Sequence, residues 1–136
     1  VLAARALAAP AGAADWFLTM LAVAHTVLLD ADAETGEVSY NADSPDEVAL
    51  VRAGVAMRYA FESRQGEKAI FISKGGAGAQ FEILETIEFT SARKRMSVVV
   101  REKGAEDAAA YLLTKGADSV MLDAYEHDGA RRAPRV

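Results

Sequence analysis

The hydrophobic pattern of this 136-residue chain changes its period near residue 60, and that change restricts the folds open to it. In the first part, Phe17, Leu21, Ala24 and Leu28 recur at the spacing of one helix face. Beyond residue 68, apolar and polar residues alternate, as they do in strands with one buried face. Helices followed by a run of strands predict an α+β fold, in which helices flank an antiparallel β-sheet.

Composition excludes several classes of function. Hydrophobic residues make up 51% and charged residues 26%, which is typical of a single globular domain. The net charge of -5 argues against a nucleic-acid partner, which requires a broad basic face. The chain has no cysteine, and His25 and His127 fit no ligand spacing, so we predict no metal site. No apolar run reaches the ~18 residues that span a bilayer, so we expect no membrane contact from this fragment.

We expect residues 1–14 to be an Ala-rich linker or cut end, residues 15–125 a folded domain and residues 126–136 a polar tail. Asp15 is expected to cap a helix that runs to about Leu29.

A second helix is predicted from "SPDE". Ser44 suits the N-cap, Pro45 the first helical position and Glu47 the third, which together form a capping box. Asp46 and Glu47 are adjacent, so their side chains diverge by about 100° around the helix and are not expected to act together on one atom. We predict no catalytic residue in this chain.

Strands are expected around residues 38–40 and over residues 68–73, 79–89, 96–102 and 109–116, with a short helix from Asp118. In the strand 79–89, Phe81, Ile83, Ile87 and Phe89 should share one face. The intervening "KGGAGA" is not a phosphate-binding P-loop, because its lysine comes first and a strand follows it.

Two stretches combine an aromatic ring with positive charge. "FTSARKRMS" places Phe89 before Arg93, Lys94 and Arg95, and "LLTKGADS" places Lys115 at a strand end. If these strands are neighbours, a ring and two ammonium groups border one pocket, which suits a purine nucleotide. The pattern alone is equally compatible with a charged, solvated kink between two strands.

Together these stretches resemble the nucleotide-binding (N) domain of P-type ATPases, and in particular the type IV branch, the phospholipid flippases. "FLTMLAVAHTV" is similar to a helix that ends in a C-H-T-V-like stretch. "YNADSPDEVALVRAG", "FTSARKRMSVVVR" and "LLTKGADSVML" resemble the family's S-P-D-E, R-K-R-M-S and K-G-A-D blocks. The matches occur in the family's order and cover residues 16–123.

The resemblance implies a role for each matching residue. Phe89 would stack on adenine, and Glu47 would lie at the adenine end of the pocket. Lys94, Lys115 and Gly116 would line the pocket along the nucleotide, with Ser91 and Met96 near its rim. Further candidates are Asp46, Arg93 and Arg95, and one of the two arginines could instead cover the sheet edge.

The resemblance also implies partners that the chain itself lacks. The parent protein would be a cytosol-facing, membrane-embedded flippase that uses ATP and Mg²⁺, with this domain presenting ATP to a separate phosphorylation domain. The phosphorylated D-K-T-G-T motif is absent, and the family's later arginine has no clear counterpart among Arg131, Arg132 and Arg135. We therefore expect the isolated chain to be a monomer without ATPase activity, which phosphate release traceable to the domain would contradict. The alternatives are an N domain of a cation-transporting P-type ATPase and a non-enzymatic module for an acidic partner.

Overall fold

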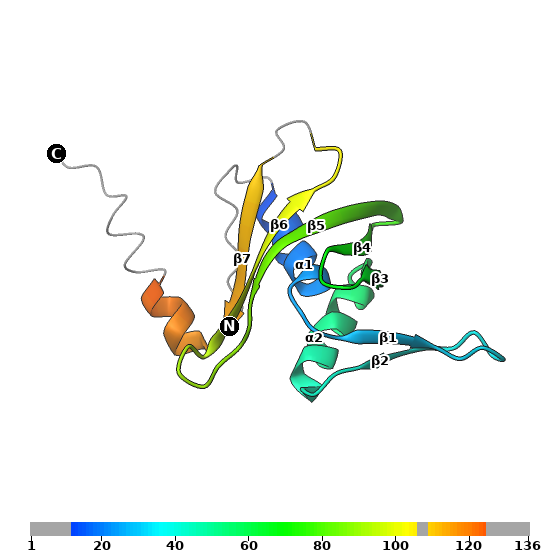
Figure 1. Cartoon of the computed structure of the whole chain (residues 1–136), viewed down its shortest axis with the longest axis horizontal. Helices are drawn as coiled ribbons and strands as arrows, with labels where there is room; N and C mark the ends of the chain where they lie inside the picture. Colours follow the sequence, from blue (N-terminus) through cyan, green and yellow to red (C-terminus); the bar gives the residue numbers. More distant parts are fainter. Residues whose placement is uncertain (1–11, 106–108, 125–136) are drawn as a thin grey trace.

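Figure 1 shows a computed structural model of the chain, in which residues 12–105 and 109–124 are described. The helices and strands are, in chain order, α1 (Ala13–Val23), β1 (Leu28–Ala31), β2 (Val38–Asn41), α2 (Pro45–Ala56), β3 (Tyr59–Gln65), β4 (Ala69–Lys74), β5 (Ala77–Ile87), β6 (Arg95–Glu102) and β7 (Ala110–Gly116). Residues 118–124 are also helical. Within the described residues, no helix is long and apolar enough to cross a membrane.

The five later strands form one sheet in the order β3-β4-β5-β6-β7, and every neighbouring pair is antiparallel. β1 and β2 pair separately as a hairpin that extends away from the sheet (Figure 1). The predicted α+β class, with helices flanking an antiparallel sheet, is confirmed. Strands β3 and β1 are additions that the hydrophobic pattern did not predict.

The core lies between the helices and one face of the sheet (Figure 1). Met20 from α1 and Val51 from α2 are fully buried, together with Ile72, Phe81 and Val100 from the sheet. Burying each of these large side chains stabilises the fold by about 2 kcal/mol relative to exposure.

The first helix differs from the prediction at both ends. It begins after Gly12, and Asp15 lies inside it with its carboxylate turned to other partners. One oxygen accepts from the Tyr59 hydroxyl at 2.7 Å and the other from the Lys74 ammonium at 3.0 Å. Asp15 therefore ties α1 to β3 and β4 and is not the cap.

The helix also ends at Val23, six residues before the predicted end at Leu29. Residues 28–31 instead pair with residues 38–41, so that Leu28 lies opposite Asn41 and is 62% exposed. The helical spacing of Leu28 was misleading, because the backbone pairing of the hairpin determines its conformation.

The predicted capping box of α2 is wrong, although its helix start is correct. Ser44 is the N-cap and Pro45 the first helical residue, but the Ser44 side chain makes no capping hydrogen bond. Glu47 does not return to Ser44, because its carboxylate is bound by Thr26 and Lys115. Tertiary partners have replaced the local ones.

Strand β5 contains a bulge that changes which side chains share a face. Ile83 pairs with Val100 but Glu85 pairs with Val99, so Leu84 is an extra residue. Thr86, opposite the buried Val98, therefore faces the core side with Phe81 and Ile83. The predicted shared face is correct for Phe81 and Ile83 and wrong for Ile87.

The other predicted strands are confirmed with small shifts of their ends. The strands expected at 68–73, 96–102 and 109–116 correspond to β4, β6 and β7. β5 ends at Ile87, so Phe89 lies in the following loop. The polar tail, His127 and most of the Ala-rich start lie outside the described residues.

Candidate functional site

The site centres on an ion pair between α2 and β7. The Lys115 ammonium lies 2.8 Å from Oε1 of Glu47, and the two side chains are only 10% and 16% exposed. Lys115 is at the end of the sheet and Glu47 in the first turn of α2. This pairing brings together two predicted site residues that are 68 positions apart.

Thr26 completes the environment of Glu47. Its hydroxyl donates to Oε2 at 2.8 Å, and its backbone N–H donates to the same oxygen at 3.3 Å. Burial raises the pKa of Glu47, but Lys115 and Thr26 together outweigh that effect, so the pKa lies below the usual range. Glu47 is therefore ionised at neutral pH and provides a fixed negative charge beside Lys115.

A buried histidine shapes the turn that carries Thr26. His25 is 1% exposed, and its Nδ1 accepts from the Val27 N–H at 3.1 Å. Its Nε2 lies 2.9 Å from the Ala22 carbonyl, which requires a proton on Nε2. Burial and the positive charge of Arg64 lower the pKa of His25 to about 3, so the ring is neutral. Arg64 also donates to the His25 carbonyl at 2.6 Å and thereby holds the turn against β3.

The pairing of β6 with β7 aligns the next group of predicted residues. Met96 lies opposite Lys115, and Arg95 lies opposite Gly116. A Cβ atom added at Gly116 would lie 2.6 Å from the Lys94 carbonyl oxygen and 2.6 Å from the Arg95 Cβ. Glycine is therefore required by the close approach of two backbones. It allows the Ala117 N–H to donate to the Lys94 carbonyl at 2.9 Å.

Phe89, Ser91 and Lys94 lie in the loop 88–94 between β5 and β6, at the same end of the sheet. Phe89 is 60% exposed, although it is a large apolar residue. Lys94 is exposed and has a φ of 51°, in the left-handed region that a non-glycine residue seldom adopts. The loop thus presents a ring and a charge to solvent beside the ion pair.

The remaining predicted residues have different surroundings. Asp46 is exposed in the first turn of α2, and Met96 is 4% exposed, so it belongs to the core. Arg95 begins β6 and is half-buried. The Arg93 guanidinium turns back toward the loop and donates to the carbonyls of Ile87 and Glu88.

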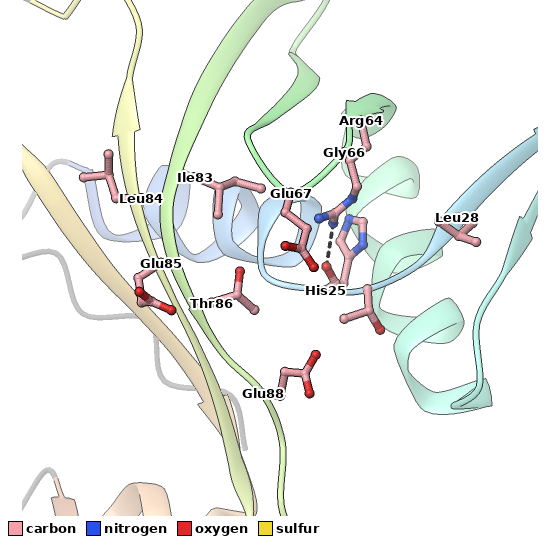
Figure 2. Close-up of a pocket in the computed structure, with 11 residues that line it drawn as sticks. His25, Leu28, Arg64, Gly66, Glu67, Ile83, Leu84, Glu85, Thr86 and Glu88 are labelled. Atoms are coloured by element: carbon pink, nitrogen blue, oxygen red, sulfur yellow. Dashed lines mark hydrogen bonds between the residues drawn. The ribbon is translucent and has the colours of Figure 1, made fainter.

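A pocket of about 480 Å³ lies between β5 and the turn at His25 (Figure 2). Thr86 and Glu88 of β5 and its following loop face Glu67 and His25 across it (Figure 2). Its lining includes Thr26, which binds Glu47, and Glu88, which precedes Phe89. None of the predicted nucleotide-contacting side chains is among the described residues that line this pocket.

A family model for the P-type ATPase cytoplasmic domain N matches residues 15–129. The chain belongs to this family.

The relatives of this N domain include named lipid transporters. It is 44% identical over 110 residues to the phospholipid-transporting ATPase tat-1 of Caenorhabditis elegans, a match that covers 81% of the chain and 9% of that protein. It is 41% identical over 120 residues to the probable phospholipid-transporting ATPase 11 of Arabidopsis thaliana, covering 85% of the chain and 10% of that protein. The N domain thus spans about a tenth of the length of these relatives.

One residue of the N-domain site was missed at the level of sequence. Thr26 binds Glu47 through both its hydroxyl and its N–H, but a threonine after an apolar helix has no distinctive local pattern. The signal available was the "HTV" stretch, which carried the family resemblance without indicating a contact.

A resident Mg²⁺ ion needs several oxygen ligands arranged around one point. Among residues 12–105 and 109–124, no group of three or more His, Asp or Glu side chains is arranged to hold a metal ion.

Proposed function

We propose that this N domain binds ATP between Phe89 and the Lys115–Glu47 pair and presents its terminal phosphate to a phosphorylation domain elsewhere in a longer protein. The observation that carries the proposal is the exposed ring of Phe89, which is 60% accessible at the sheet end where the ion pair lies. An exposed phenylalanine gains free energy when a flat base covers it, by about 1–3 kcal/mol.

The charges near this ring suit the rest of a nucleotide. The Lys115 ammonium has three hydrogens, and its bond to Glu47 uses one of them. The exposed Lys94 adds a second positive charge on the loop. A nucleotide fits this arrangement when its base stacks on Phe89 and its phosphates pass these ammonium groups. The ring and the positive charges then each have a partner.

The names of the relatives support a specific parent protein. We propose that it is a phospholipid-translocating P-type ATPase of a membrane, with this domain on the cytosolic side and Mg²⁺ arriving with ATP. The lipid would be moved by parts of the protein outside this chain. Of the two alternatives from sequence, the cation-transporting parent is less favoured, since the relatives described above are phospholipid-transporting enzymes.

Titration of variants with ATP and adenosine by NMR tests the proposal. We expect a Kd on the order of millimolar, about 4 kcal/mol, because the terminal phosphates have no partner in the isolated domain. Phe89→Ala should lose ~1–3 kcal/mol of that, which makes ATP binding almost undetectable, whereas Phe89→Tyr and Phe89→Trp should retain much of it. Lys94→Ala should weaken binding of ATP more than of adenosine, and less so at high salt.

The controls separate this proposal from the binding-module alternative. A folded Phe89→Ala variant that binds ATP as well as the parent would exclude the ring as the adenine platform. Binding of an oligonucleotide with steep salt dependence, in the absence of ATP binding, would favour an acidic partner at residues 93–95 instead.

A further inference from the structure

Arg93 occupies an unusual position in the loop 88–94, because its side chain binds the backbone on both sides of that loop. Its Nη1 donates to the carbonyls of Ile87 at 3.2 Å and Glu88 at 2.8 Å, where β5 ends. The same atom donates to the Arg95 carbonyl at 3.1 Å, where β6 begins. Nη2 lies 3.4 Å from the Ser97 hydroxyl. The guanidinium therefore joins the two strand ends directly.

The loop itself is closed by a second set of bonds around Thr90. The Lys94 N–H donates to the Thr90 carbonyl at 2.8 Å, and the Arg93 N–H donates to the Thr90 hydroxyl at 3.1 Å. Lys94 takes a left-handed conformation, and its carbonyl is held by the Ala117 N–H. A conformation of this kind persists only where its surroundings hold it.

These contacts commit Nη1 of Arg93 to backbone carbonyls. All three carbonyls are reached by Nη1, which lies one bond farther along the side chain than the ammonium nitrogen of a lysine, so a lysine cannot place its donor at the same point. The contrast with Lys94 is direct, since that side chain is exposed and Arg93 is half-buried.

We propose that Arg93 is a positioning residue, which clamps the ends of the loop 88–94 and so fixes Phe89 and Lys94 in a binding geometry, without contacting the nucleotide itself. This inference rests on the proposed function. Because the loop is ordered before the ligand arrives, binding does not have to order it. Removal of the clamp should therefore weaken every ligand that uses the ring, including one without phosphates.

The test uses the chain as it stands, with Arg93→Lys and Arg93→Met compared with the parent. NMR titration with ATP and with adenosine, at low and high salt, measures affinity, and amide hydrogen exchange without nucleotide measures loop order. We expect both variants to bind ATP and adenosine roughly tenfold more weakly, by similar factors at both salt concentrations. We also expect faster exchange over residues 89–94. Arg101→Lys, at the far end of β6, is the matched control and should change neither reading.

A direct phosphate contact would give a different pattern. In that case Arg93→Lys would bind ATP like the parent, and Arg93→Met would lose ATP but not adenosine, with a loss that shrinks as salt rises. Either that pattern or unchanged loop exchange in both variants would overturn the inference. Should Arg93→Met fail to fold, the milder Arg93→Lys variant carries the test. The proposed function is tested separately, because it fails if Phe89→Ala binds ATP with the same affinity as the parent domain.

Discussion

The loop 88–94 and the Glu47–Lys115 pair are neighbours at one end of the sheet, but they are built in opposite ways. The loop exposes its ring and its lysine, and its shape depends on backbone carbonyls held by Arg93. The ion pair is largely buried, and its charges are fixed by each other and by Thr26. The difference shows that the charges of Glu47 and Lys115 are fixed by side-chain partners, whereas the positions of Phe89 and Lys94 depend on loop geometry.

The largest expected effect is at Gly116, where these two regions meet. Gly116→Ala should destabilise the domain by about 3–4 kcal/mol, because its Cβ would meet the Lys94 carbonyl and the Arg95 backbone, which cannot move aside as a flexible side chain would. Denaturant unfolding measures the change. Gly78→Ala in β5 has nothing within 4 Å of its added Cβ and should be nearly neutral. A Gly116→Ala variant as stable as the parent would mean that the end of β7 and the residues at 94–95 can move apart without loss of folding free energy.

The next effect concerns the buried pair alone. Glu47→Gln should cost about 3 kcal/mol, because it leaves the Lys115 ammonium without a counter-charge in a site that is only 10% exposed. The matched control is Glu82→Gln, whose pair with Arg101 is 43% and 56% exposed and should be worth under about 1 kcal/mol. Equal losses in the two variants, measured by chemical denaturation, would show that the Glu47 pair behaves like a surface pair.

The turn that supports the buried pair should respond to pH. The pKa of His25 is about 3 in the folded state, compared with 6.5 for an unperturbed histidine, so this ring contributes stability above pH 6.5 that is lost as pH falls toward 3. At 1.36 kcal/mol per unit, the loss between pH 7 and pH 5 is about 2 kcal/mol. The lowered pKa of Glu47 affects stability only below about pH 4.5, the usual pKa of a glutamate, which is outside this window.

The measurement is the difference in unfolding free energy between pH 7 and pH 5. His25→Gln should largely abolish this difference, while His127→Gln, outside the described residues, should keep it. A parent domain whose stability does not change over this range would mean that His25 accepts a proton while the fold persists.

The smallest effect is at Ser44. A capping box would make Ser44→Ala cost about 1 kcal/mol. Because the Ser44 side chain makes no capping bond and Glu47 binds elsewhere, we expect a loss below about 0.5 kcal/mol. Thermal unfolding of Ser44→Ala and of the parent decides between the two values. A loss near 1 kcal/mol would mean that Ser44 and Glu47 form the capping box after all.

The parts of the fold that follow from local pattern were predictable. Strands β4, β6 and β7 have clear alternation, and Pro45 after Ser44 marks the start of α2. β1 and β3 were missed. β1 was read as helix because Leu28 happens to fall at helical spacing, and such a spacing cannot reveal pairing with residues 38–41.

The candidate site was predictable only through residues that form recognisable blocks. Lys115 and Glu47 were selected from separate motifs, and the structure brings them within 2.8 Å. The roles of Thr26 and Arg93 depend on contacts across the fold, which no local pattern encodes. Whether these residues bind a nucleotide stays a prediction.

The extra residue Leu84 in β5 has a consequence for comparing this chain with others. Upstream of it odd-numbered residues face the core, and downstream of it the even-numbered Thr86 does. If a relative lacks this residue, an alignment without a gap matches core-facing residues of one chain with outward-facing residues of the other over one half of the strand. Deleting Leu84 should therefore remove the bulge, restore continuous pairing with β6 and leave every other side chain of β5 on its present face, so that a spatially correct alignment of these eleven residues needs a one-residue gap at Leu84.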